Sequence, residues 1–263
     1  MSRSESMEKS GKRITTFQLC YPRFIHGEIM THRVFSRNAM SSRAVPVAKM
    51  IAQVRSMPAK PVHWGANQAG MQATAEVRTV CAEFLWMKAA KAAADIAEEM
   101  EKLGLHKQVA NRILEPFQWM RTIVTSTEWE NFYELRDHPD AQPEFQHLAK
   151  MMHAAHKASV PNFLNEGNWH LPYVSEAEVG MNSFEELPVD LRKVSAARCA
   201  RVSYLTHDGQ KPDVTKDLAL FDRLAGGRPL HASPLEHQAT PGDTDTGNFF
   251  GWTQYRKLWE KEV

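Results

Sequence analysis

Residues 31–43 read Thr31-His32-Arg33-Val34-Phe35-Ser36-Arg37-Asn38-Ala39-Met40-Ser41-Ser42-Arg43. Three arginines, three serines, a histidine and an asparagine fall within these positions. The planar guanidinium fork of arginine matches phosphate oxygens, and serine hydroxyls and free loop amides add donors to the same anion. By composition alone, a solvated basic loop is an equally good interpretation. Evidence from other segments of the sequence is needed to distinguish an anion site from an ordinary surface loop.

The composition is that of a globular protein with no general affinity for polyanions. The chain has 263 residues, of which 43% are hydrophobic and 24% charged, and its formal net charge is +1. We therefore expect no nucleic-acid partner. No apolar run is long enough to span a bilayer, so we expect no membrane partner either. The three cysteines are widely spaced and match no metal pattern, which favours a reduced, cytoplasmic setting.

Local patterns predict a mixture of strands and helices in one domain. Residues 11–21 are rich in β-forming residues up to Pro22. Apolar spacing predicts one long helix near 74–103, with Thr74 as its cap, residues such as Val80 and Phe84 on its buried face, and Gly104 as its stop. We expect a disordered lead over 1–12 and a single domain over 13–263. Further helices are expected at 24–33, 46–55, 107–114, 129–135, 143–158, 191–204 and 213–224, a loop at 36–44 and a strand at 120–125.

Two other clusters could carry chemistry. Residues 231–237 contain two histidines and a glutamate around Pro234, but their spacing matches no strong zinc pattern, and a simple turn is the plainer interpretation. Arg112 and Arg136 lie beside apolar residues, and a semi-buried arginine needs an anionic ligand or an acidic neighbour such as Glu115 or Asp137. Glycine-rich dinucleotide and P-loop motifs are absent from the sequence. We expect no metal site.

Together these segments resemble the flavin-dependent thymidylate synthase (ThyX) family. The family signature is Arg-His-Arg, seven residues and a serine, and here Thr31-His32-Arg33 precedes Ser41 at that spacing. Phe17-x4-Pro22-x-Phe24 resembles the preceding strand and helix entry, and 129–136 resembles a later helix. Two more family motifs are matched by 200–204, Ala-Arg-Val-Ser-Tyr, and by 231–237, His-x-Ser-Pro-x-Glu-His. The resemblance implies an α+β fold with a mixed sheet flanked by helices.

The resemblance also implies which residues form the site. Arg136 and Ser41 are the candidate catalytic residues: Arg136 would stabilise charge on the pyrimidine, and Ser41 would act by binding. The implied substrate-binding residues are Glu28, Ser41, Ser42, Arg43, Arg112 and Arg136. The implied cofactor-binding residues are His32, Arg33, Ser36, Asn38, Asn131, Gln142, Ser203, His231 and Ser233.

This sequence departs from the family pattern in its residues and in its order. Thr31 replaces the first arginine of the signature, Ala39 replaces a glutamate, and Glu28 stands where glutamine is frequent. Thr125 and Thr127 stand where asparagine and arginine help to hold flavin in some members. In the usual arrangement the segments matched by 200–204 and 231–237 come first, so the chain resembles a circularly permuted member.

The activity implied by the resemblance is the conversion of dUMP to dTMP, with methylenetetrahydrofolate as carbon donor, reduced FAD as hydride donor and NADPH as reductant of the flavin. The resemblance also implies a homotetramer with active sites shared between chains. Glu28 leaves open a relative that modifies C5 of dUMP or dCMP, for example by hydroxymethylation. Thr31 and Ala39 leave open a non-catalytic flavin- or nucleotide-binding homologue.

Overall fold

A computed structural model describes residues 2–7, 11–182, 188–202, 209–211 and 213–262. Its centre is a five-stranded sheet of order β3-β4-β2-β1-β5. The strands are β1 (Ser2–Met7), β2 (Arg13–Pro22), β3 (Ser36–Ala39), β4 (Trp119–Ser126) and β5 (Asn162–Phe163). All pairs are antiparallel except β1 with β5, which are parallel, so the expected mixed sheet is confirmed.

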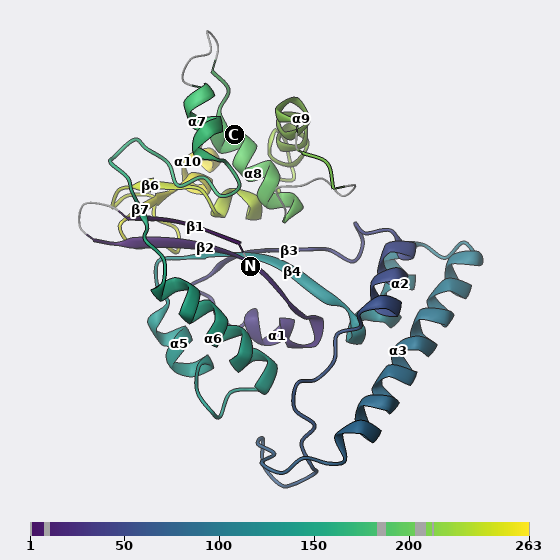
Figure 1. Ribbon diagram of the computed structural model, residues 1–263. Coiled ribbons are helices and arrows are strands. Elements are labelled where there is room, and N and C mark those ends of the chain that lie inside the picture. Colours follow the sequence, from purple (N-terminus) through teal and green to yellow (C-terminus); the bar gives the residue numbers. More distant parts are fainter. Residues whose placement is uncertain (1, 8–10, 183–187, 203–208, 212, 263) are drawn as a thin grey trace.

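Helices cover one face of this sheet through a dense aromatic core. The short helix α1 (His26–Ile29) follows the turn η1 (Arg23–Ile25), and α5 (Glu130–Arg136) and α6 (Pro143–Lys157) lie beside it (Figure 1). Because successive strand residues point to opposite faces, Phe17 and its partner Val124 both face these helices. Trp129 and Phe132 of the α5 segment join them in the core, which fixes α5 against the sheet.

The chain after β5 builds the opposite layer. It contains α7 (Glu176–Asn182), α8 (Leu191–Arg201), α9 (Val214–Ala225), η3 (Ser233–Glu236), the β6–β7 hairpin (Ala239–Pro241 and Trp252–Gln254) and α10 (Tyr255–Glu262). Figure 1 shows this layer above the sheet, with α1, α5 and α6 below it. Ile123 of β4 packs against Cys199 and Val202 at the end of α8. The C-terminal segments therefore lie over β4 and its neighbours.

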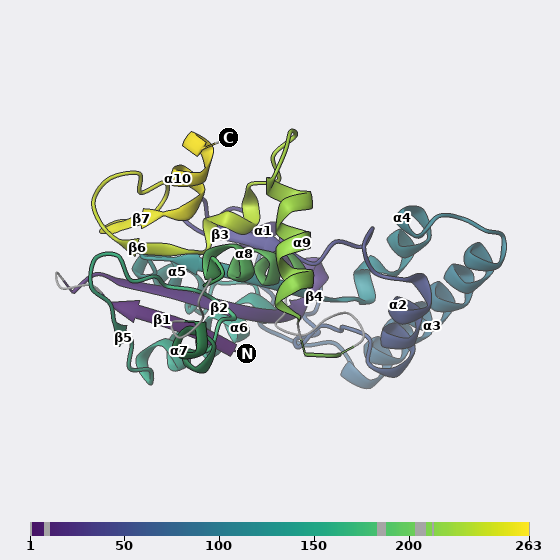
Figure 2. The same cartoon turned by 90° about the horizontal axis from the view of Figure 1, so that it is seen from above.

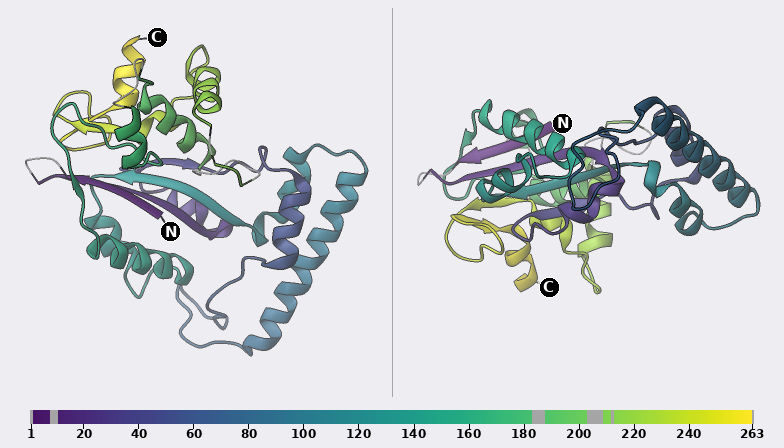
Figure 3. Two further views of the ribbon diagram at one scale, coloured as in Figure 1. Left: turned by 45° about the horizontal axis from the view of Figure 1, so that its top comes forward. Right: turned by 90° about the horizontal axis from the view of Figure 1, so that it is seen from below.

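A helical arm extends from one end of the sheet (Figures 2 and 3). It is formed by α2 (Val47–Ser56), α3 (Thr79–Lys102), α4 (Lys107–Ala110) and η2 (Asn111–Phe117). The buried residues of α3 are four alanines, at positions 90, 93, 94 and 97. Their small side chains let α2 approach closely. Together with Ala110 and Leu114 they form a separate core cluster.

Three sequence expectations were wrong at this level. The long helix begins at Thr79 with Arg78 at its cap, and its expected core residues Val80 and Phe84 are 75% and 67% exposed, because the alanine stripe is the face that packs. Residues 36–39 form a strand where a loop was expected, because β4 offers an edge for backbone pairing. Residues 2–7 pair with β2 where a disordered lead was expected.

Buried charge joins α7, α8 and α9 of the C-terminal layer. Arg198 is fully buried; it donates from Nε to Asp217 at 2.9 Å, from Nη1 to the carbonyl oxygen of Tyr173 at 2.7 Å and from Nη2 to Glu178 at 2.7 Å. Arg201 also pairs with Asp217, at 2.5 Å. Among the described residues, no helix is both long and apolar enough to cross a membrane.

Replacing Asp217 by alanine should lower the free energy of unfolding by about 3–5 kcal/mol, because the buried guanidinium of Arg198 then loses one of its two carboxylate partners. Asp222→Ala on the exposed face of the same helix serves as the matched control and should change it by less than about 0.5 kcal/mol. Urea unfolding measures both. Equal stabilities of the two variants would contradict the role given to this network.

Candidate active site

One cluster of predicted residues lies under the sheet, where α1 meets α5. Arg136 is the last residue of α5; its Nη1 donates to Oε2 of Glu28 at 3.1 Å and its Nε donates to Nε2 of His32 at 3.0 Å. The guanidinium also lies 4.6 Å from the ring centre of Phe145, a cation–π contact. Its side chain remains 20% exposed. The structure thus holds Arg136 on three sides and leaves part of it open to a ligand.

His32 supports Arg136 as a neutral acceptor. The ring is 8% exposed and packs against Phe35, Phe132 and Phe145. Burial, together with the positive charges of Arg136 and Arg37, lowers the pKa of His32 to about 4. Because arginine can only donate, Nε2 must accept and the ring proton must sit on Nδ1.

A second cluster lies on the opposite face of the sheet. Asn38 pairs in register with Ile123, and its Nδ2 donates to the carbonyl oxygen of Cys199 at 2.8 Å. Ser233 of η3 donates from Oγ to Oδ1 of Asn38 at 3.2 Å. Val202, one turn beyond Cys199, takes φ +52°, a left-handed conformation that costs about 1–3 kcal/mol for a β-branched residue. The 231–237 motif and Cys199, which directly precedes the 200–204 motif, thus meet the strand of the 31–43 segment.

Ser36 anchors the same face to the C-terminal hairpin. Its Oγ donates to Oδ1 of Asn248 at 3.1 Å, and Gln254 donates from Nε2 to Ser36 and to Asn248. The side chain of Glu236 pairs with Arg256. Sequence reasoning missed Asn248, because nothing local distinguishes an asparagine in a glycine-rich turn far from position 36 along the chain.

A chain of buried hydrogen bonds runs through this face. His237 Nδ1 lies 2.8 Å from the Thr125 hydroxyl, which lies 2.7 Å from that of Thr16, and Thr16 lies 2.8 Å from His170 Nε2. Burial lowers the pKa of both His237 and His170 to about 3. Nε2 of His237 is buried without a hydrogen-bond partner. This nitrogen is therefore able to make one further hydrogen bond.

The 41–45 loop is fixed from the helical arm. Asn111 is fully buried and donates from Nδ2 to the carbonyl oxygens of Ser42 and Val45, at 2.7 and 3.0 Å. Ser41 and Arg43 remain exposed at the surface of this loop. Arg112 is exposed, contrary to the semi-buried position expected from the sequence. It donates to Glu115 at 2.9 Å, so the ion pair left open by the sequence forms at the surface.

The remaining predicted residues are scattered. Arg33, Asn131 and His231 are exposed, and Ser203 lies outside the described residues. Gln142 caps the start of α6 by accepting from the backbone amide of Phe145. In the part of the chain that the structure describes, no group of three metal-ligating side chains is close enough to hold an ion.

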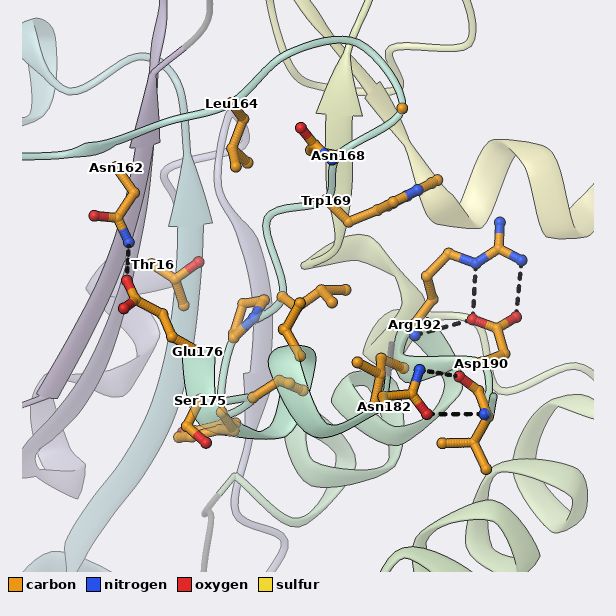
Figure 4. A pocket seen from close by; sticks show the side chains of 18 of the residues that line it. Thr16, Asn162, Leu164, Asn168, Trp169, Ser175, Glu176, Asn182, Asp190 and Arg192 are labelled. Atoms are coloured by element: carbon orange, nitrogen blue, oxygen red, sulfur yellow. Dashed lines mark hydrogen bonds and ion pairs between the residues drawn. The ribbon is translucent and has the colours of Figure 1, made fainter. Parts of the chain in front are cut away.

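One groove among the described residues is lined by none of the predicted site residues. It has a volume of about 1390 Å³ and lies between the edge of the sheet and residues 160–192. Figure 4 shows Arg192 in bidentate contact with Asp190, with the ring of Trp169 nearby. This guanidinium is already neutralised and lies 5.1 Å from the centre of that ring. Neither the volume of the groove nor its paired Arg192 indicates that a nucleotide binds there.

Comparison with known proteins identifies the family of the chain. The sequence model of the thymidylate synthase complementing protein family matches residues 13–162. The chain therefore belongs to this family, also called ThyX. No curated protein matches it by sequence.

Two solved structures of one enzyme are similar to part of the chain. Both are of the UMP/dUMP methylase PolB from Streptomyces cacaoi, bound with 5-Br dUMP and with 5-Br UMP. Their sequence identities are 18% and 19% and their TM-scores 0.46 and 0.45. The matches cover 54% of this chain and 66% and 67% of those chains.

Nitrogen NMR of the histidine rings tests the support of Arg136. At pH 5.5 His32 should be neutral and protonated on Nδ1, because its pKa is about 4 and Nε2 accepts from Arg136. The urea-unfolded chain, in which histidines titrate near pH ~6.5, is the control. Since the unfolded state takes up this proton first, the contribution of His32 to stability is lost as pH falls from about 6.5 towards 4. A charged His32 at pH 5.5, or one protonated on Nε2, would contradict the geometry.

Proposed function

We propose that this chain is a flavin-dependent thymidylate synthase. It converts dUMP to dTMP with methylenetetrahydrofolate as carbon donor, reduced FAD as hydride donor and NADPH as the reductant of the flavin. The observation that carries the proposal is the geometry of Arg136 in a member of this family: Glu28 and His32 fix its guanidinium, and a fifth of its side chain remains exposed.

The residues of the upper cluster are compatible with a flavin. Ser36, Asn38 and Ser233 present hydroxyl and amide groups, and His237 leaves a buried nitrogen without a partner. The nearby acid, Glu236, is neutralised by Arg256, so the cluster presents no unpaired carboxylate to the anionic pyrophosphate of FAD. When bound, reduced FAD supplies the hydride that turns the transferred methylene into a methyl group.

Arg136 has the properties needed to act on the pyrimidine. Carbon C5 of uracil is a weak nucleophile. It would attack the folate methylene when negative charge develops on the ring oxygens, as on loss of the N3 proton. A guanidinium fixed by Glu28 and His32 stabilises this charge without having to reorient. Neutral His32 keeps the Nε proton of Arg136 engaged, so the remaining N–H groups are the ones available to the base. Arg43 and the Ser41 hydroxyl, both exposed on the 41–45 loop, are the groups that we assign to the nucleotide phosphate.

The two clusters support a shared active site. In one chain, Arg136 lies beneath the sheet and Ser36 and Asn38 lie above it, so residues assigned to pyrimidine and flavin face different layers. A homotetramer in which neighbouring chains complete each site accounts for this separation. We place this enzyme in the cytoplasm. The contacts of Asn38 with Cys199 and Ser233 likewise support a circular permutation, because they bring the displaced motifs to the strand that usually follows them.

The purified protein should bind FAD, and with dUMP, methylenetetrahydrofolate and NADPH it should form dTMP detectable by mass spectrometry. Parallel reactions with dCMP, and with each cosubstrate omitted, are the controls. No flavin binding at saturating FAD would refute the proposal, as would a hydroxymethylated product.

Arg136→Ala and Arg43→Ala should each weaken dUMP binding or turnover by about 1.5–3 kcal/mol, the effect of one charged hydrogen bond. The control is Arg55→Ala, because Arg55 is exposed on α2 and pairs only with Asp95 and Glu98 in the described chain. Steady-state kinetics with dUMP separates the two effects. Wild-type values for both site variants would show that the residue assignment is wrong.

A further inference from the structure

Arg37 is a half-buried arginine to which neither the family signature nor the site described above gives a role. It lies on β3, and its Nη1 donates to the carbonyl oxygens of Met30 at 2.9 Å and His32 at 2.8 Å. These two carbonyl groups flank Thr31 on either side. The guanidinium of Arg37 therefore lies against the backbone of the position where the signature has its first arginine.

Thr31 itself is turned towards the backbone. Its Oγ1 donates to the carbonyl oxygen of Glu28 at 2.6 Å and closes the turn after α1. A threonine side chain is short and carries no charge, so this position offers no cation to a ligand. Arg37, which lies on β3, places a positive charge beside this position.

The charge of Arg37 has no direct counter-ion in the described part of the chain. The acid that influences it, Glu236, raises its pKa while burial lowers it, but Glu236 makes its ion pair with Arg256. By contrast, Arg136 pairs with Glu28 and Arg112 with Glu115. A guanidinium stays charged in proteins, so Arg37 adds a positive charge that the described side chains leave unpaired.

The geometry also leaves a binding edge. Both carbonyl contacts of Arg37 use Nη1, and Nε and Nη2 make no hydrogen bond to any described residue. These two nitrogens form the parallel pair of donors that binds two oxygens of one phosphate. The two carbonyl contacts fix the guanidinium before a ligand arrives. Less side-chain entropy is therefore lost when the ligand binds.

We propose that Arg37 is a phosphate-binding residue that supplies, from β3, the positive charge missing at Thr31. The ligand class is a phosphoryl or pyrophosphoryl group, carried either by the flavin nucleotide or by the pyrimidine nucleotide. The inference rests on the proposed function for the identity of that nucleotide, but the anion site itself can be tested without it.

The test compares wild type, Arg37→Gln, the double variant Arg37→Gln/Thr31→Arg, and the control Arg55→Gln. Glutamine keeps a polar side chain without charge, but its amide ends at the position of Nε, so the contacts that Nη1 makes with the carbonyl oxygens of Met30 and His32 are lost as well. Calorimetry measures binding of inorganic pyrophosphate, of FMN and FAD against riboflavin, and of dUMP against deoxyuridine. Thermal melting of each variant reports any loss of the turn.

Arg37→Gln should weaken pyrophosphate binding by about 10-fold or more, the effect of one charged hydrogen bond. In one of the two comparisons, the flavins or the pyrimidine nucleotides, Arg37→Gln should lower the affinity for the phosphorylated ligand and leave that for the unphosphorylated one unchanged. That comparison identifies the nucleotide that carries the phosphate. The double variant should recover most of the affinity, and Arg55→Gln should bind as wild type does.

Three outcomes would overturn the proposal: pyrophosphate that does not bind wild type at millimolar concentration, equal binding of pyrophosphate by wild type and Arg37→Gln, or an equal loss for phosphorylated and unphosphorylated ligands with a lower melting temperature. Absence of dTMP synthesis by wild type would refute the proposed function instead. The pyrophosphate result decides the role of Arg37 in either case.

Discussion

The position of Arg136 between a carboxylate and a neutral imidazole is the interaction on which the account of this protein depends. Glu28 fixes one nitrogen of the guanidinium and His32 another, while Phe145 covers its face. The aromatic core under the sheet serves this geometry, because burial among Phe35 and Phe132 keeps His32 uncharged and able to accept. Without that core, a protonated His32 would repel Arg136.

The remainder of the fold brings distant segments to the 31–43 segment. Asn111 holds the 41–45 loop from the helical arm, and Ser233 and Cys199 reach Asn38 from the C-terminal layer. Segments far apart along the chain therefore meet at β3, as the proposed circular permutation requires. A permutation is tolerated when such contacts, rather than chain connectivity, hold the elements together.

Glu28, His32 and Arg136 could be named from the sequence, because the segments that hold them resemble family motifs. Their mutual contacts could not be predicted, since His32 was expected at the cofactor and not beside Arg136. The strand at 36–39 could not, since β4 lies far along the chain and supplies its pairing. The face of α3 was assigned wrongly because large apolar residues outweighed alanines in the pattern, whereas close helix packing favours the alanines. The free edge of Arg37 depends on two carbonyl groups that no sequence pattern reveals.

The central claim is that the hydride of the new methyl group comes through a flavin, on a pyrimidine held by Arg136. The most direct measurement is the mass of dTMP formed in D₂O with unlabelled NADPH and folate. The N5 hydrogen of a reduced flavin exchanges with solvent, whereas the C–H hydrogens of the folate do not. The account predicts a deuterium in the product methyl group, and a methyl group free of deuterium would contradict it.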